Sequence, residues 1–212
     1  LPKQTMEQWK ADIEIALQLG IQHISSYGLM YEEGTPLTHL LEQGVIEPID
    51  EDTENEMYDY LCARLQQAGF EHYEVSNFAL PGYKAIHNSN YWNGTPYIGI
   101  GAGAHSYYSY SVDNNTQKYI RCANPDDLDA YMACDLQQDN TISQKETLTP
   151  VDLFNEYIML GLRTNQGISL DKMAREMREL ELANDYHTTI KKINTYIDNH
   201  LLLKTNDNRI IA

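Results

Sequence analysis

Residues 22–29 read QHISSYGL, a short β-prone run that follows a predicted helix after a two-residue turn. Thr5 is a favourable N-cap for that first helix. Residues 50–68 predict a later helix, and residues 70–76 (FEHYEVS) predict a second strand directly after it. A short helix over residues 36–41 completes the order helix, strand, helix, helix, strand. Short connections in this order are typical of an α/β fold with a parallel sheet.

The composition changes after residue 77, where a long stretch rich in Gly, Tyr and Asn runs to residue 106. We expect a polar and aromatic loop here, and loops of this length are more often functional than decorative. Residues 107–112 and 117–122 then predict two strands joined by a turn. A helix is expected over residues 124–134.

Residues 141–150 predict a polar link into a second, mainly helical part. Its expected elements are helices over 151–163, 170–177 and 185–199 and a terminal β-hairpin over 201–211. Helices followed by a hairpin are typical of a small winged-helix-like unit. We therefore expect two domains, residues 1–140 and residues 141–212.

The charge balance and the hydropathy pattern narrow the classes of partner and location that we expect for this protein. The 212 residues contain 15 Lys and Arg against 31 Asp and Glu, a formal net charge of −16. A nucleic-acid interface needs clustered cations, so this class of partner is disfavoured. The chain has no run of about 18 apolar residues and no basic segment leading into an apolar one, so we expect neither a membrane span nor a signal peptide. A cytoplasmic protein is the resulting expectation.

Three cysteines, Cys62, Cys122 and Cys134, lie far apart and form no C-x-x-C pair. No histidine follows any of them at zinc-finger spacing. The simplest interpretation is that they are small apolar residues in a reducing compartment.

Gly99, Gly101 and Gly103 alternate directly after a short apolar run. Because glycine has no Cβ, a ligand can approach the backbone closely at such positions. The spacing lacks the G-x-G-x-x-G pattern of a dinucleotide loop. Two interpretations stay open here, a ligand-binding backbone and glycines that allow a tight strand contact.

Residues 87–92 (HNSNYW) combine an imidazole, a carboxamide and two large rings within six positions. The rings of Tyr91 and Trp92 offer area to a flat ligand, Asn88 offers an orienting amide, and His87 offers a metal ligand. The alternative is that these aromatic side chains only fold the segment over its own domain, with His87 bonded to a carbonyl oxygen.

Six motifs occur in an order and spacing that resemble one family. They are LPxQT at 1–5, HISxYxL at 23–29, EGTPL at 33–37, YEVSNFA at 73–79, HNxxYW at 87–92 and GxGAGAHS at 99–106. The chain resembles the HemW-type heme chaperones, relatives of the oxygen-independent coproporphyrinogen III oxidases (HemN) in the radical S-adenosylmethionine superfamily. LGLRT at 160–164, followed by Gly167 and Ile168, resembles the start of the family's C-terminal domain, so the resemblance covers essentially the whole chain.

The resemblance implies the back half of a partial (β/α)6 radical-SAM barrel, followed by a small helical, winged-helix-like C-terminal domain. It also implies that the full-length protein holds S-adenosylmethionine and a [4Fe–4S] cluster on a C-x-x-x-C-x-x-C loop. This chain contains no such loop. We therefore expect the cluster-bearing half upstream of Leu1, and we expect this chain alone to be catalytically inactive.

The resemblance also implies roles for individual residues. On the S-adenosylmethionine side of the pocket it places Tyr27, Met30, Gly101, Gly103, Ala104 and His105. At a heme site it places His87, Asn88, Tyr91 and Trp92, with His87 as a candidate ligand of the heme iron. Phe78 is expected to help wall the macrocycle.

The function favoured by the resemblance is binding of heme and its transfer to acceptor hemoproteins, because the oxidases lack the full HNxxYW motif. A first alternative is the oxidative decarboxylation of coproporphyrinogen III to protoporphyrinogen IX. A second alternative is a non-catalytic domain that covers the barrel or docks a partner. An exposed strand edge near the start of the chain is an expected site of association.

Overall fold

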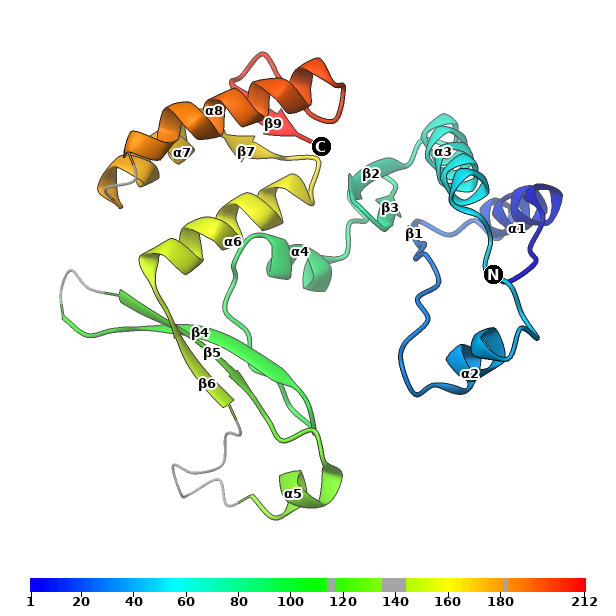
Figure 1. The fold of residues 1–212 in the computed structure, drawn as a ribbon, viewed down its shortest axis with the longest axis horizontal. Helices are drawn as coiled ribbons and strands as arrows, with labels where there is room; N and C mark the ends of the chain where they lie inside the picture. Colours follow the sequence, from blue (N-terminus) through cyan, green and yellow to red (C-terminus); the bar gives the residue numbers. More distant parts are fainter. Residues whose placement is uncertain (114–116, 135–143, 181–182) are drawn as a thin grey trace. The chain divides into compact units, whose positions relative to one another are not determined.

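The chain divides into two compact units, Leu1–Ala85 (unit 1) and Ile86–Ala212 (unit 2). The computed structural model describes residues 1–113, 117–134, 144–180 and 183–212. Part of the predicted turn after residue 112 therefore lies outside the described residues. Figure 1 shows the elements of each unit. The domain boundary predicted between residues 140 and 141 stays a prediction.

Unit 1 combines three helices with one small sheet. Its elements are α1 (Met6–Gln18), β1 (His23–Ser25), α2 (Pro36–Glu42), α3 (Glu51–Gln67), β2 (Glu71–Glu74) and β3 (Asn77–Ala79). The strand order is β1-β3-β2, and both pairings are antiparallel. The predicted parallel sheet is therefore wrong for these strands. The chain turns at Val75 and Ser76 and returns as β3, which separates β1 from β2 and buries Phe78 completely.

Local signals position the helices of unit 1. Thr5 and Gln8 form a reciprocal capping box at the start of α1, as the choice of Thr5 as N-cap predicted. Asp50 caps α3 by accepting a hydrogen bond from the backbone N–H of Thr53 at 2.9 Å. The two helices pack against the sheet through one apolar cluster. Its buried members are Ile13, Leu61, Leu65, Phe70 and Phe78.

Unit 2 contains the remaining elements. They are α4 (Ile86–Trp92), β4 (His105–Ser111), β5 (Gln117–Ala123), α5 (Leu128–Met132), β6 (Gln144–Leu148), α6 (Pro150–Leu162), β7 (Ile168–Ser169), α7 (Leu170–Glu179), α8 (Ala183–Asp198), β8 (Leu203–Lys204) and β9 (Arg209–Ile211). The two predicted strands over 107–112 and 117–122 are confirmed as the antiparallel pair β4 and β5.

Two predictions for unit 2 are wrong. Residues 86–92 form helix α4 where a loop was expected, and Gly94, at φ +73°, follows its end. Asn, Ser and aromatic residues are weak helix formers, so tertiary packing outweighs local propensity here. The expected polar link contains strand β6, which pairs antiparallel with β5 and buries Leu148. An edge strand with mostly exposed polar residues gives little hydrophobic periodicity to read.

The last part of unit 2 follows the predicted order of helices and terminal hairpin. Ser169 caps α7 as expected, accepting a hydrogen bond from Lys172 N–H at 3.2 Å. The structure adds strand β7, which was missed because it has only two residues, and the sheet order is β7-β9-β8. One apolar cluster fills this part: Phe154, Ile168, Leu170, Met173, Met177, Ile193, Leu202 and Ile210. In Figure 1, α6 lies between the β4-β5-β6 sheet and helices α7 and α8.

Candidate functional site

Helix α4 divides the HNxxYW motif into two pairs. His87 and Tyr91 are one turn apart and share a face, because residues four apart meet on a helix surface. Both are exposed, and their rings meet edge to face with centroids 5.0 Å apart. Asn88 and Trp92 share the adjacent face and are half-buried. The Tyr91 ring therefore packs against one side of the exposed His87 imidazole.

Trp92 faces α6. The guanidinium of Arg163, the C-cap residue of α6, lies 4.7 Å from the centroid of the Trp92 ring. The Trp92 indole N–H is buried and meets no hydrogen-bond acceptor among the described residues. Arg163 was quoted from the sequence only as part of LGLRT, and nothing in the sequence linked it to HNxxYW. An arginine at a helix end and a tryptophan 71 positions earlier give no local signal of contact.

A series of tyrosines continues from His87 into the unit. Tyr91 meets Tyr97 with ring centroids 4.8 Å apart, Tyr97 lies 6.2 Å from Tyr107, and Tyr107 stacks on Tyr119 at 6.0 Å. An isolated backbone bridge joins Tyr97 to Tyr107. Burial raises the pKa of both Tyr97 and Tyr107. These rings join α4 to the face of the β4-β5 pair, so the surroundings of His87 are supported by packed aromatic side chains.

Arg121 on β5 ties the same sheet to α6. Its guanidinium donates to the Glu156 carboxylate on α6 and lies 3.6 Å from Glu146 on β6. Burial acts to lower the pKa of Arg121, but the hydrogen bond and the charge of Glu156 outweigh it and raise that pKa. Arg121 is therefore occupied by carboxylates of the chain itself.

Phe78 does not belong to this aromatic region. It is fully buried in the core of unit 1, stacked on the His72 ring at 4.3 Å. The expectation that Phe78 walls a macrocycle is wrong, because its side chain is fully buried in the core of unit 1.

In the glycine-rich segment the tight-contact interpretation is confirmed at Gly99, and ligand binding stays a prediction. A Cβ at Gly99 would collide with the backbone of His105, so Gly99 serves a tight internal contact. Gly101, at φ +113°, has no atom within 4 Å of a Cβ position, so its backbone is open on one side. Its polar groups are held inside the unit, since Asn124 donates to Gly101 O at 2.8 Å and Tyr131 OH accepts from Gly101 N at 3.1 Å.

The other residues of this segment make backbone contacts within unit 2. Gly103 adopts φ +67° and donates from its N–H to Pro125 O at 2.8 Å. Ala104 is half-buried, and His105 is exposed at the start of β4, where it pairs with Ala123. Among Gly99, Gly101 and Gly103, Gly101 is therefore the glycine with no atom within 4 Å of its Cβ position.

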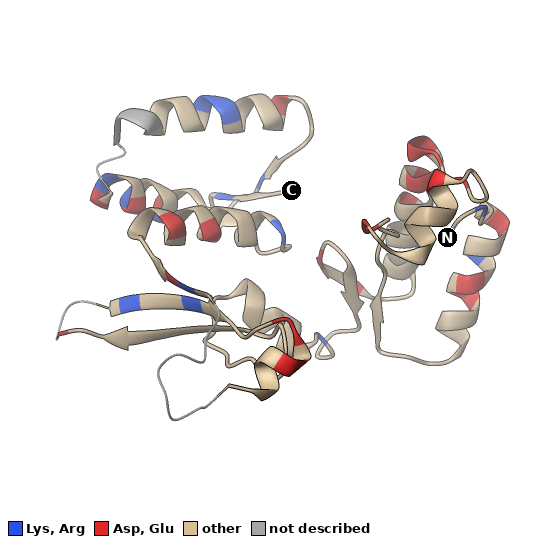
Figure 2. Ribbon diagram, turned by 60° about the horizontal axis from the view of Figure 1, so that its bottom comes forward, with Lys and Arg blue, Asp and Glu red and all other residues tan. Residues whose placement is uncertain are grey.

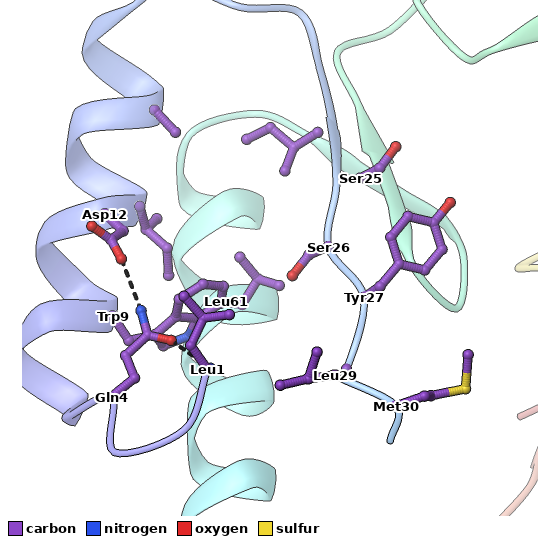
Figure 3. A pocket seen from close by; sticks show the side chains of 14 residues that line it. Leu1, Gln4, Trp9, Asp12, Ser25, Ser26, Tyr27, Leu29, Met30 and Leu61 are labelled. Carbon is purple, nitrogen blue, oxygen red and sulfur yellow. Dashed lines mark hydrogen bonds between the residues drawn. The ribbon is translucent and has the colours of Figure 1, made fainter. Parts of the chain in front are cut away.

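Tyr27 and Met30 lie in unit 1, at the rim of a pocket of about 460 Å³ that follows the end of β1. Its inner lining comes from α1, β1 and α3 and includes Trp9, Ile13 and Leu61. In Figure 3 the side chains of Tyr27 and Met30 point away from α1, and they are 68% and 73% exposed. Both residues line the pocket and leave most of their side-chain surface exposed.

Buried polar side chains fix the strand end that carries Tyr27. Ser25 OH donates to Asn77 Oδ1 at 2.5 Å, and the Asn77 amide donates to the Glu74 carboxylate. Ser76 N–H also donates to that carboxylate, at 3.0 Å, and Ser26 N–H donates to Ser76 O at 2.8 Å. The YEVSNFA motif alone does not predict this hydrogen-bond network, because the contacts depend on the pairing of β1 with β3.

The described residues contain no group of three or more His, Cys, Asp or Glu side chains able to hold a metal ion. Cys62 lies in unit 1, and Cys122 and Cys134 lie in unit 2; within the described residues, none of the three is in a disulfide bond. Burial raises the pKa of the Cys62 thiol, which disfavours the thiolate that iron requires. These residues do not fit a [4Fe–4S] cluster. Within the same described ranges, no helix is long and apolar enough to cross a membrane.

Comparison with known proteins shows which proteins the chain resembles in sequence. No family model matches the chain. The chain is 33% identical over 181 residues to the heme chaperone HemW of Lactococcus lactis, covering 84% of this chain and 44% of that protein. It is 33% identical over 169 residues to the mitochondrial radical S-adenosyl methionine domain-containing protein 1 of Danio rerio, covering 80% and 38%. The chain thus spans less than half the length of these relatives.

The solved structure of the Escherichia coli coproporphyrinogen III oxidase HemN, a radical SAM enzyme, aligns with the whole chain at a TM-score of 0.70. The identity is 17%, and the alignment covers 49% of that enzyme. The mixed α/β fold is therefore HemN-like. The chain is thus homologous to part of the heme chaperone HemW and has a HemN-like fold, which is consistent with a partial HemW/HemN-like protein.

Proposed function

We propose that the chain is the heme-binding part of a heme-handling protein of the radical SAM superfamily, with heme chaperone as the favoured activity. The observation that carries the proposal is the exposed His87 imidazole on α4, beside the Tyr91 ring, in a chain 33% identical to a heme chaperone. An imidazole nitrogen is a common axial ligand of heme iron, and an aromatic ring edge packs well against a macrocycle.

The residues present fit a heme better than they fit the iron–sulfur cluster. His87 supplies an accessible nitrogen, Tyr91 supplies apolar area, and the buried Trp92 indole N–H still lacks an acceptor in the described chain. When bound, heme would supply the iron that the imidazole ligates. The chain's own residues hold and orient it, and Asn88 completes the polar edge of α4.

The finer architecture belongs to the same proposal. Unit 1 would be a piece of a partial (β/α)6 barrel within a domain of residues 1–140. Residues 141–212 would form a winged-helix-like domain, which is supported by the order α6-β7-α7-α8-β8-β9 and the sheet order β7-β9-β8. Tyr27, Met30 and the segment from Gly101 to His105 would face S-adenosylmethionine, whose cluster would be held by cysteines outside this chain. Acceptor hemoproteins and a cytoplasmic location are part of this proposal.

A heme titration tests the proposal directly. We expect the 212-residue chain to give a Soret band that shifts on binding, and His87→Ala to change both the spectrum and the affinity. His200→Ala is the matched control, since His200 lies beyond α8 in the same unit. Identical spectra and affinities for the wild type and His87→Ala would remove His87 as the iron ligand.

The oxidase is the second candidate function, and the HemN-like fold favours it. Here the protein would initiate decarboxylation of the propionates of coproporphyrinogen III. Full-length protein with reconstituted cluster, substrate, S-adenosylmethionine and reductant decides the question. Formation of protoporphyrinogen over many turnovers would support the oxidase, and its absence would leave the chaperone.

A purely covering role for the C-terminal part is tested by deleting residues 151–212 from the full-length protein. Heme binding, cluster retention and partner binding should all persist if this part is only a cover. We expect heme binding to fall, because Arg163 contacts Trp92 of α4 and Glu156 of α6 anchors the sheet through Arg121.

A further inference from the structure

The pocket of about 460 Å³ in unit 1 has apolar walls and lies outside the proposed heme site. Helix α1 contributes Trp9, Ile13 and Ala16 to its lining, and α3 contributes Leu61. Trp9 is held in position, because its indole N–H donates to Met57 O at 2.8 Å. Cavities of several hundred Å³ with apolar and aromatic walls are typical binding sites. The pocket therefore offers a preformed place for an apolar side chain.

Carboxylates flank this pocket on both helices. Asp12 of α1 is exposed and belongs to the lining. On α3, Glu54 shares a face with Met57 and Leu61, because residues three and four positions apart are neighbours on a helix surface. The Glu54 Oε1 atom is 3.0 Å from the Cβ position of Gly28, another lining residue. An apolar pocket with acidic edges attracts cations and repels anions.

The negative charge around the pocket is not neutralised by its own stretch of chain. Residues 11–63 contain twelve Asp and Glu and no Lys or Arg. The cations that border this stretch are both engaged, since Lys10 lies over the Tyr60 ring at 5.0 Å and Arg64 is bound by Glu14. Figure 2 shows acidic residues on α1 and on α3. An apolar partner with positive charges on both sides is complementary to this surface.

We propose that unit 1 docks a basic segment of a partner protein, with one apolar side chain in the pocket and flanking Lys or Arg side chains near Asp12 and Glu54. Burial of the apolar side chain contributes affinity, and the cations steer association and select the partner. Because the acids come from two helices, several separated cations are required, and a polypeptide presents them at regular spacing. The side chains of Tyr27 and Met30 point away from α1 in Figure 3, so the position between α1 and α3 is separate from them.

The test titrates the 212-residue chain calorimetrically with an octapeptide that has two central leucines between two runs of three lysines. Matched peptides replace the leucines by serines or the lysines by glutamates. We expect the leucine–lysine peptide to bind about tenfold more tightly than the serine peptide, the lower end of what burial of one leucine contributes. The glutamate peptide should not bind. Trp92→Phe leaves Trp9 as the single tryptophan, and its emission should shift with the leucine–lysine peptide and not with the serine peptide.

Two alanines of α1 distinguish the pocket from the rest of the surface. Ala16→Leu adds side-chain volume at the lining and should abolish the preference for leucine over serine. Ala11→Leu makes the same change at an exposed position outside the lining and should leave the preference intact. Leucine and alanine are both good helix formers, and thermal unfolding checks that both variants fold. A preference that survives Ala16→Leu would overturn the proposal, as would equal affinities of the wild type for the leucine and serine peptides.

A double variant tests the charges. Asp12→Asn with Glu54→Gln should weaken the leucine–lysine peptide about fivefold at low salt and reduce the salt dependence of binding. Glu179→Gln with Asp198→Asn removes two exposed acids of unit 2 and should change neither quantity. Equal losses from the two double variants, or binding of the glutamate peptide, would overturn the charge selection. A dimer in sedimentation that Ala16→Leu converts to monomer would assign the pocket to a second copy of this chain and overturn the proposal.

Discussion

Unit 1 and unit 2 are stabilised in different ways at their centres. In unit 1 the sheet of β1, β3 and β2, with the turn between β2 and β3, contains Glu74, Ser76 and Asn77. These residues are 3%, 8% and 2% exposed. The C-terminal core of unit 2 is apolar throughout, from Phe154 to Ile210. Hydrogen bonds define the register of the first sheet, while close packing of backbone and aliphatic side chains defines the last one.

The two units also differ in charge. Unit 1 has four Lys and Arg against fifteen Asp and Glu, and unit 2 has eleven against sixteen. Figure 2 shows the acidic residues along α1 and α3. The net charge of −16 therefore comes mainly from unit 1. A ligand with free carboxylates meets less repulsion at unit 2, which contains His87.

The largest expected effect probes the close packing of unit 2. Gly167→Ala should lower the free energy of unfolding by about 4 kcal/mol, since a Cβ there collides with Ile210 O and φ is +62°. Gly101→Ala is the control, because its φ is also positive but its surroundings are open, and about 1 kcal/mol is expected. Urea unfolding measures both. Equal losses would mean that backbone strain alone, without close packing, accounts for the need for glycine.

The buried network of unit 1 is probed by Asn77→Ala. This change removes the acceptor of Ser25 and a donor to Glu74 in a fully buried place, so about 3 kcal/mol of stability should be lost. Asn124→Ala in unit 2 is the matched asparagine, half-buried and bonded to Gly101 O, and should cost about 1 kcal/mol. A loss at Asn77 no greater than that at Asn124 would contradict the distinction between the units.

The smallest expected effects concern two equivalent capping boxes. Thr5 pairs with Gln8 at α1, and Thr149 pairs with Asp152 at α6. Thr5→Ala and Thr149→Ala should each cost about 1 kcal/mol at pH 7, as measured by thermal unfolding. A markedly unequal cost would show that one helix depends on its cap and the other on its packing.

Acid probes both helix starts, because Thr149 bonds to the Asp152 carboxylate and Thr5 contributes a hydrogen bond to Glu7. Hydrogen bonds from Thr149 lower the pKa of Asp152 below its ordinary value. A folded-state pKa below the unfolded one gives stability that is present above the unfolded pKa and lost as the pH falls through the folded pKa. The Thr149→Ala penalty should therefore shrink below about pH 4. The Thr5→Ala penalty should shrink in the same direction, because backbone hydrogen bonding and then a hydrogen bond from Thr5 lower the pKa of Glu7. In an Asp152→Asn background the pH dependence of the Thr149→Ala penalty should vanish.

Local sequence signals predicted helices well and strand pairing poorly. Thr5, Ser169 and the acids at the start of α3 marked helix starts correctly, because caps act within one turn of the chain. The β4 and β5 strands were predicted because each has seven residues, long enough for a β-prone run on either side of a turn to be recognised. Strands β3 and β7 have three and two residues, too few for any period to appear.

The candidate site shows the same division. Sequence clustering made His87, Asn88, Tyr91 and Trp92 candidates, and the resemblance assigned them to a heme site, which stays a prediction. Their separation into an exposed pair and a half-buried pair required the helix. Ligand approach to the glycine backbone stays a prediction, and the contacts of Gly101 with Asn124 and Tyr131 were not predicted. Phe78 was misplaced because an aromatic residue in a motif does not reveal which side of a strand it occupies.

The sequence by itself determined the capped helix starts, the acidic balance, the absence of a cluster motif in this chain and the six ordered motifs that resemble HemW-type proteins. These are properties of neighbouring residues or of composition. Tertiary structure alone decided the antiparallel return of β3, the burial of Glu74 and Asn77, and the contact between Arg163 and Trp92. Each joins residues separated along the chain, and such contacts depend on how elements pack rather than on local conformational preference.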